Sequence, residues 1–193
     1  MRRTTPQTRA FLCFTSMVIA TCLLLVLPSS AQNGGEVFTA NAIPSETTVG
    51  NMGGRVVIRV VSYTSEAEKA KLVEVFKKDP TAGLALLRTM SKGYLNVEGQ
   101  SGRKIEAAFV RQRQDGTELI LIGEHMLTKL EQSRGVKVED HPLAVIHLRF
   151  SSDGKPVSGE AFPAVKLTIT EDGFPDVKTD DSNHITLINV ARR

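Results

Sequence analysis

The chain has 193 residues, with 24 Lys or Arg against 21 Asp or Glu, and its formal net charge at pH 7 is +3. This length suits a single domain with an export segment. The two signs of charge are interspersed, Trp is absent and only two Tyr are present. Nucleic-acid binding usually needs a basic stripe with aromatic stacking partners, so we expect no nucleic-acid partner.

Residues 1–31 are predicted to be a secretory signal peptide. A start with three arginines precedes an uncharged apolar stretch at residues 10–27, and small residues follow up to Ala31. We expect cleavage after Ala31, which would give a secreted or periplasmic bacterial protein that begins at Gln32. The apolar stretch is 18 residues long, so an uncleaved membrane anchor is the alternative. We expect contact with a membrane only through this segment, if it stays uncleaved.

Both cysteines, Cys13 and Cys22, lie in the predicted signal peptide. The mature chain would therefore have no disulfide, no thiolate metal site and no thiol nucleophile. Cleavage would also remove three arginines, leaving 21 basic residues (24 less 3) against 21 acidic ones. We expect a formally neutral domain that folds without a metal or a cofactor.

Residues 32–54 are predicted to be a flexible tether. Five glycines stand there among small and polar residues, and large apolar residues are few. The remaining residues, 55–193, are predicted to form a single α+β domain.

The start of this domain is predicted to be a strand at 55–63, followed by two helices. Ser65-Glu66-Ala67-Glu68 is the pattern of a capping box, in which the first and fourth residues satisfy each other's backbone donors. This predicts a helix that continues to about Lys78. Asp79-Pro80 suits an N-cap and a first helical position, so a second helix is expected from Pro80 to about Lys92, with Gly93 ending it in a left-handed conformation.

A hairpin is predicted over residues 103–122. Ile105, Ala107 and Phe109 alternate with Lys104, Glu106 and Ala108, which is typical of a strand with one buried face. Asp115-Gly116 then predicts a tight turn. The next strand, residues 118–122, is apolar on both sides and should be covered on both faces.

The C-terminal part of the chain is predicted to be mainly β. After a short strand at 94–98 and the hairpin, residues 125–133 could form a helix or an irregular cover. Strands are expected at 142–151, 164–170 and 184–190, with turns at the two Asp-Gly pairs, Asp153-Gly154 and Asp172-Gly173. The order of elements predicts an α+β fold: an antiparallel sheet of about six to seven strands, with two helices after the first strand packed on one face.

Three features together resemble a group of exported bacterial proteins without an established activity. They are the strand at 142–150, the Asp153-Gly154 turn and the terminal Leu187-Ile188-Asn189-Val190. The likeness would cover residues 55–193. It implies an opening strand, two short helices and an antiparallel sheet, and it implies no activity and no functional residue.

His147 and Arg149 are the candidate ligand-binding residues. They lie two positions apart on a predicted strand, so both side chains should point the same way. Arg offers a planar fork of donors and His changes charge near neutral pH, so the pair could hold an anionic group. The alternative interpretation is a polar sheet face exposed to solvent.

No catalytic, metal-binding or cofactor-binding residue is predicted. The four histidines lack the spacing of a zinc motif, and Gly99-Gln100-Ser101-Gly102 is typical of a turn between strands. The oxygen-rich loop at 176–183 lacks the pattern of a calcium loop. We expect a non-catalytic module that binds an envelope partner or a small ligand; the alternatives are a hydrolase using His141 with Asp140, and a structural module that docks by strand addition.

Overall fold

The computed structural model describes residues 35–44, 54–99, 101–127, 143–178 and 184–193. The chain divides into two units, Met1–Ser30 and Ala31–Arg193, and every described residue belongs to the second. The predicted signal peptide lies outside the described residues. Among those described, no helix has the length and apolar character needed to cross a bilayer.

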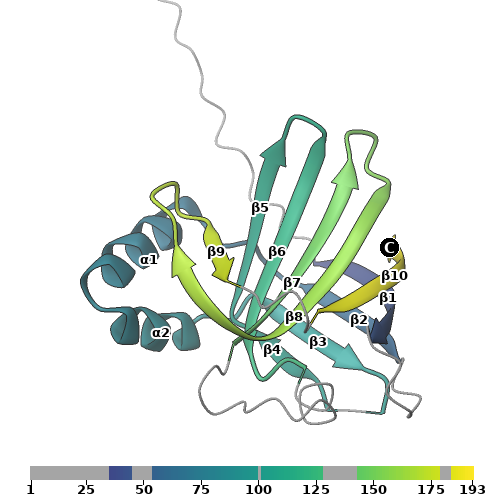
Figure 1. Cartoon of the computed structure of the whole chain (residues 1–193), viewed down its shortest axis with the longest axis horizontal. Helices are drawn as coiled ribbons and strands as arrows, with labels where there is room; N and C mark the ends of the chain where they lie inside the picture. Colours follow the sequence, from purple (N-terminus) through teal and green to yellow (C-terminus); the bar gives the residue numbers. More distant parts are fainter. Residues whose placement is uncertain (1–34, 45–53, 100, 128–142, 179–183) are drawn as a thin grey trace, which may run out of the picture. The chain divides into compact units, whose positions relative to one another are not determined.

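The second unit is an α+β fold built on antiparallel strands, which confirms the predicted class (Figure 1). The elements, in chain order, are β1 (Glu36–Pro44), β2 (Arg55–Val60), α1 (Glu66–Lys78), α2 (Pro80–Thr89), β3 (Gly93–Val97), β4 (Arg103–Ile105), β5 (Ala107–Arg113), β6 (Gly116–Glu124), β7 (Leu143–Ser151), β8 (Pro156–Ile169), β9 (Pro175–Lys178) and β10 (Ile185–Arg192). The sheet order is β4-β3-β2-β1-β10-β8-β7-β6-β5, and β9 pairs with β8. The predicted strand number was too low.

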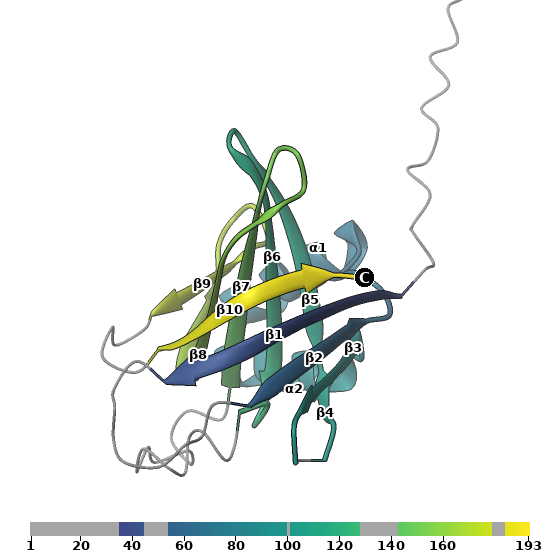
Figure 2. The same ribbon diagram turned by 90° about the vertical axis from the view of Figure 1, so that its right-hand side faces the viewer.

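The sheet is curled (Figure 2), and its two terminal strands, β4 and β5, are consecutive in the chain. Only Glu106 separates β4 from β5. Ile105 of β4 pairs with Gly93 of β3, whereas Ala107 of β5 pairs with Ile122 of β6. The amide of Glu106 donates to the carbonyl of Ile122 at 2.9 Å. One stretch of chain therefore serves both ends of the sheet.

Glu106 also reverses the direction in which the side chains point. Ile105 lies in the core inside the curl, whereas Ala107 and Phe109 lie in a second core on its outer face, and Ala108 returns to the inside. The prediction of a strand with one buried face was therefore wrong. Both faces are buried, and the simple alternation breaks at Glu106.

The inner core is formed by the concave faces of the strands. Ala144, Ile146 and Leu148, at alternate positions of β7, are fully buried there. Phe38 of β1 meets Phe150 of β7 with ring centroids 5.6 Å apart. The inner core thus joins strands that are far apart in the sequence, such as β1 and β7.

The outer core lies under the two helices. Leu72 of α1 and Leu87 of α2 are buried in it together with Phe109, Ile120 and Val145 of the sheet. This explains why the strand at 118–122 is apolar on both sides, as predicted, because Leu119 and Leu121 face the inner core. The helices cover one face of the sheet, on β5 to β8.

The helix boundaries follow their caps. Ser65 and Glu68 form the predicted capping box, and the Asp79 side chain accepts from the amide of Thr81 with Pro80 at the first helical position. The prediction for Gly93 was wrong. The C-cap of α2 is Met90, with an extended backbone, and Gly93 opens β3, where a Cβ atom would lie 2.0 Å from the carbonyl oxygen of Arg59.

The predicted tether over residues 32–54 was wrong for residues 36–44, which form β1. This strand lies between β2 and β10, and the helices consequently follow the second strand and not the first. Its inward residues Phe38, Ala40 and Ala42 are buried, but two of them are only alanine. The short apolar side chains and the neighbouring glycines concealed the alternation in the sequence.

Substitution of Ile146 by Asp is expected to unfold the domain. The side chain is fully buried in the inner core, and burying an unpaired carboxylate costs several kcal/mol or forces its pKa upward, against a total stability of roughly 5–15 kcal/mol. Thermal melting by circular dichroism measures the effect. Ile43→Asp is the matched control because Ile43 is 45% exposed, and it should keep a cooperative melt. Melting of Ile146→Asp like the wild type would contradict the inward orientation of β7.

Candidate functional site

The two residues singled out in the sequence, His147 and Arg149, lie on the outer face of β7. Arg149 belongs to a row of paired residues that crosses four strands: Arg111 on β5, Glu118 on β6, Arg149 on β7 and Ser158 on β8. His147 belongs to the next row, between Ile120 and Glu160. These rows border the outer core, so the pair lies where the apolar surface gives way to a polar one.

Glu118 is the centre of this surface. It is buried, with 3% of its area exposed, and four basic side chains lie within 4 Å of its carboxylate. The contacts are Arg113 Nη1 to Oε2 at 3.4 Å, His147 Nδ1 to Oε1 at 3.7 Å, Arg149 Nε to Oε1 at 3.8 Å and Arg111 Nη1 to Oε2 at 3.9 Å. We call these five residues the Glu118 cluster. The sequence pattern indicated His147 and Arg149 but not Arg111, Arg113 or Glu118.

His147 is held neutral near pH 7. Burial lowers its pKa below the usual 6.5, and this outweighs the carboxylates of Glu118 and Glu160, which act in the opposite direction. The guanidinium groups of Arg149 and Arg111 lower the pKa further. The contact with Glu118 is therefore a contact between a carboxylate and a neutral imidazole, and it becomes an ion pair only in acid.

Two nitrogen atoms of the cluster have no hydrogen-bond partner within the described part of the chain. They are Nε of Arg111 and Nε2 of His147, and both are buried. The His147 ring meets Phe162 edge-on, with centroids 5.6 Å apart. Nε of Arg111 is a donor, and a buried donor without an acceptor is costly. Nε2 of the neutral His147 is an acceptor when Nδ1 donates toward Glu118. The cluster thus has one buried donor that its own side chains do not satisfy.

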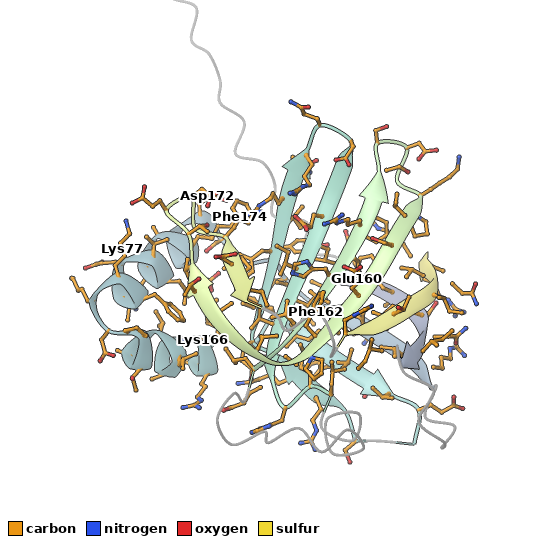
Figure 3. All side chains as sticks on the ribbon, in the orientation of Figure 1. Lys77, Glu160, Phe162, Lys166, Asp172 and Phe174 are labelled. Atoms are coloured by element: carbon orange, nitrogen blue, oxygen red, sulfur yellow. The ribbon has the colours of Figure 1, made fainter. Side chains whose placement is uncertain are left out.

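The β8–β9 hairpin holds Arg111 in place. Phe174 of this hairpin lies between two cations, with Arg111 Cζ 4.3 Å and Lys69 Nζ 4.6 Å from its ring centroid. Asp172 Oδ2 is 3.9 Å from Arg111 Nη2. Figure 3 shows Asp172 and Phe174 together at the hairpin, next to the helices. The more exposed members, Arg113 and Arg149, with 41% and 53% of their side chains exposed, face solvent.

A second feature is a small pocket of about 200 Å³ at one rim of the curled sheet. Its apolar wall includes Phe38, Leu119 and Phe150. At its rim the Tyr63 hydroxyl donates to Glu36 Oε2 at 2.5 Å, and Arg192 Nη2 donates to Glu36 Oε1 at 2.5 Å. Burial, reinforced by the hydrogen bond to Glu36, raises the pKa of Tyr63 far above its usual value. Both partners of Glu36 are thus donors, and the carboxylate is satisfied.

The other residues singled out in the sequence do not form a site within the described part of the chain. His141, Asp140 and most of the oxygen-rich loop lie outside them, although Asp176 belongs to β9. Gly99 has a positive φ of 73°, as a turn requires. No group of three or more His, Cys, Asp or Glu side chains arranged to hold a metal occurs in the ranges that the structure describes.

Comparison of the chain with protein-family models, with curated proteins and with solved structures finds no match. The resemblance to a group of exported bacterial proteins therefore stays a prediction, and the site has to be interpreted from its own geometry.

The lowered pKa of His147 predicts a loss of stability in acid. Unfolding returns the imidazole to a pKa of about 6.5, so below that pH the unfolded chain binds the extra proton. The contribution of His147 to the free energy of unfolding is thus fully present above pH 6.5. It falls as the pH drops towards the pKa of the folded state, by at most about 1.4 kcal/mol per pH unit.

Denaturant unfolding at pH 7.5, 6.5 and 5.5 checks this, with His147→Gln as the comparison. The variant should lose less stability between pH 7.5 and 5.5 than the wild type. Burial raises the pKa of Glu106, but that effect is common to both proteins and cancels in the difference. If the stability of the two proteins depended equally on pH, the pKa of His147 in the folded protein would not lie below its value in the unfolded chain.

Proposed function

We propose that the mature chain is a non-catalytic, exported binding module of the bacterial envelope that recognises an anionic group through the Glu118 cluster. The observation that carries the proposal is the surplus of donors. Three guanidinium groups and one imidazole surround a single buried carboxylate at 3.4–3.9 Å, and Nε of Arg111, a buried donor, has no acceptor in the described part of the chain.

The arrangement suits a ligand that bears one carboxylate or phosphate group. Glu118 contacts Arg113 and Arg149 from the sheet side, and their more exposed guanidinium groups have further N–H donors. Arg presents five such donors in a planar fork, which matches the oxygens of a carboxylate or a phosphate. An anion placed over Arg113 and Arg149 could accept from both without displacing Glu118.

The acidic neighbours limit the class of ligand. Asp172 contacts Arg111, and Glu160 lies beside His147 in the same row. Asp172, Glu160 and Glu118 together carry three formal negative charges, which equal the positive charges of the three arginines. A polyanion such as a nucleic acid would meet these carboxylates, whereas a single anionic group over the exposed arginines would not. The proposal is therefore a small acid or an acidic group on an envelope partner.

A hydrolytic role has no comparable support. Nε2 of His147 has no hydrogen-bond partner among the described residues, and Nδ1 faces Glu118. No described Ser or Thr hydroxyl is therefore placed for activation by this imidazole. The other hydrolase candidate, His141 with Asp140, lies outside the described residues.

Thermal shift with inorganic phosphate, citrate and a short acidic peptide tests the proposal at pH 5.5 and pH 8. At least one probe should raise the melting temperature of the wild type, and the increase should grow as the pH falls through the lowered pKa of His147, where the imidazole gains a positive charge. Arg149→Ala should weaken binding roughly tenfold, since a hydrogen bond to a charged group contributes about 1.5–3 kcal/mol.

Arg59→Ala is the matched control, because Arg59 is an exposed arginine on β2, in a different part of the sheet. It should bind like the wild type and melt like it without ligand. Absence of any response at either pH, or Arg149→Ala binding as tightly as Arg59→Ala, would leave a polar face exposed to solvent as the better interpretation.

A further inference from the structure

The small pocket at the rim of the curled sheet, of about 200 Å³, is the open end of the inner core. We call it the rim pocket. Its lining follows from the register of the strands. Gln112, Thr117 and Phe150 form a row of paired residues across β5, β6 and β7, and Val110 pairs with Leu119 in the next row on this face, towards the core. An apolar floor therefore lies beneath a polar rim.

The rim has hydrogen-bond donors to spare. The Thr117 hydroxyl donates to Oε1 of Gln112 at 3.1 Å, and the amide nitrogen of Gln112 has no acceptor in the described part of the chain. Arg192 uses Nη2 to bind Glu36, but a guanidinium has five N–H donors and this side chain is 54% exposed. Glu36, in contrast, already accepts from both Tyr63 and Arg192. The rim therefore offers donors to a ligand and has little need of further ones.

The rim pocket carries no net charge. Glu36 and Arg192 bear opposite charges and lie 2.5 Å apart, and the other lining residues are not Asp, Glu, Lys, Arg or His. An anion held by Arg192 would approach the Glu36 carboxylate, and a cation held by Glu36 would approach the guanidinium group of Arg192. A neutral acceptor such as a carbonyl oxygen meets neither repulsion.

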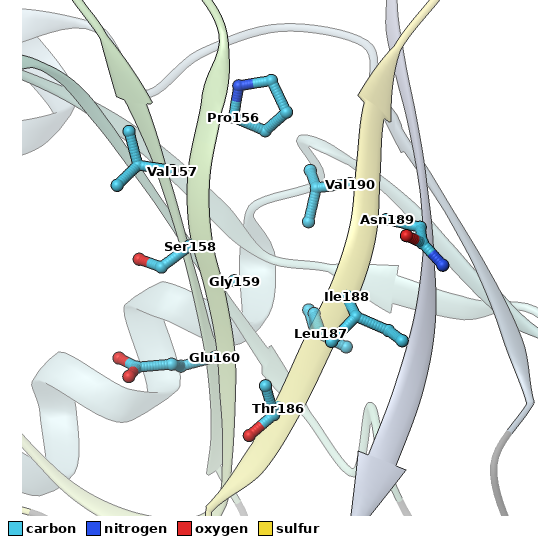
Figure 4. A pocket seen from close by; sticks show the side chains of 10 residues that line it. All are labelled: Pro156, Val157, Ser158, Gly159, Glu160, Thr186, Leu187, Ile188, Asn189 and Val190. Atoms are coloured by element: carbon cyan, nitrogen blue, oxygen red, sulfur yellow. The ribbon is translucent and has the colours of Figure 1, made fainter.

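A larger hollow of about 390 Å³ between β8 and β10 differs in its chemistry (Figure 4). The polar side chains of Ser158, Glu160 and Asn189 point away from the space between the two strands. Gly159 lies against Leu187, since a Cβ atom at Gly159 would be 2.8 Å from Leu187 Cβ. Of these two hollows, the rim pocket is the one that combines an apolar floor with free donors.

We propose that the rim pocket binds a small neutral molecule whose apolar body fills the pocket and whose carbonyl oxygen accepts from Gln112 and Arg192. At the packing density of a protein interior, the space of about 200 Å³ holds roughly ten non-hydrogen atoms, which is a ring with a short substituent. Phe38 and Phe150 in the wall favour an aromatic ring. This inference does not depend on anion binding at the Glu118 cluster, which lies on the outer face of the sheet.

Three benzene derivatives of equal size test the proposal: acetophenone, which is neutral and has a carbonyl oxygen, cumene, which has no acceptor, and benzoate, which is an anion. NMR titration of the mature chain follows the methyl signals of Val110 and Leu119, because both residues line the rim pocket. Acetophenone should give saturable shifts at these methyl groups. Its Kd should be about fivefold lower than that of cumene, since a neutral hydrogen bond contributes about that factor, and lower than that of benzoate because of Glu36.

Two variants and their matched controls locate the site. Gln112→Ala should weaken acetophenone binding about fivefold and leave cumene binding unchanged, whereas Gln114→Ala, at an exposed position outside the pocket lining, should bind like the wild type. Val110→Trp should fill the pocket and abolish the shifts at Leu119. Val157→Trp is its control, because Val157 is 67% exposed and does not line the rim pocket.

Four results would overturn the proposal. They are the absence of saturable shifts at Val110 and Leu119 with any of the three probes, an equal Kd for acetophenone and cumene, a lower Kd for benzoate than for acetophenone, and an unchanged affinity for acetophenone in Gln112→Ala.

Discussion

The break at Glu106 is the constraint on which the rest of the structure depends. In an unbroken strand Ile105, Ala107 and Phe109 would all face the same core, whereas here Ile105 faces the inner core and Phe109 the outer one. Glu106 provides this turn. Its carboxylate accepts from the amide of Glu124 at 3.0 Å and lies 3.3 Å from Lys104 Nζ. Burial nevertheless raises its pKa, so the break places a polar group where the sheet has little solvent.

The curl separates two cores and thereby creates the polar surface. The concave face closes on itself and needs no helices. The convex face of β5 to β8 is covered by α1 and α2 over only part of its length, as the outer core shows. Where the helices no longer cover these strands, their outward residues are polar. Arg111, Glu118 and Arg149 form a row of such residues on β5, β6 and β7. The Glu118 cluster therefore lies at the edge of the outer core.

A buried carboxylate beneath three arginines is costly unless its contacts compensate for lost hydration. The contacts here are longer than good charged hydrogen bonds, with the shortest at 3.4 Å. Glu118 therefore does not use all the donors of the three guanidinium groups, and in the proposed function an external anion accepts from the remaining ones. In the rim pocket, by contrast, Tyr63 and Arg192 donate to Glu36 at 2.5 Å, and that carboxylate is satisfied.

The helices and most strands could be predicted because their signals are local. The capping box at Ser65, the Asp79-Pro80 start and the alternation on β7 each depend on neighbouring residues. β1 could not be predicted in the same way, because its small inward residues pack well only between β2 and β10. Nothing in the sequence indicated the role of Glu118, since it opens an apolar run and its partners come from two other strands, β5 and β7. The short pairing of β10 with β8 depends on the register of β10, which one sequence does not define.

The most direct test of this account is a measurement of scalar couplings across hydrogen bonds by NMR. We predict a coupling from the Glu106 amide nitrogen to the Ile122 carbonyl carbon, and another from the Lys92 amide nitrogen to the Ile105 carbonyl carbon, because these bonds have lengths of 2.9 and 2.7 Å. Both couplings together show one stretch of chain joined to both ends of the sheet. A missing Glu106 coupling, with fast exchange of that amide, would contradict the curl and the two cores that follow from it.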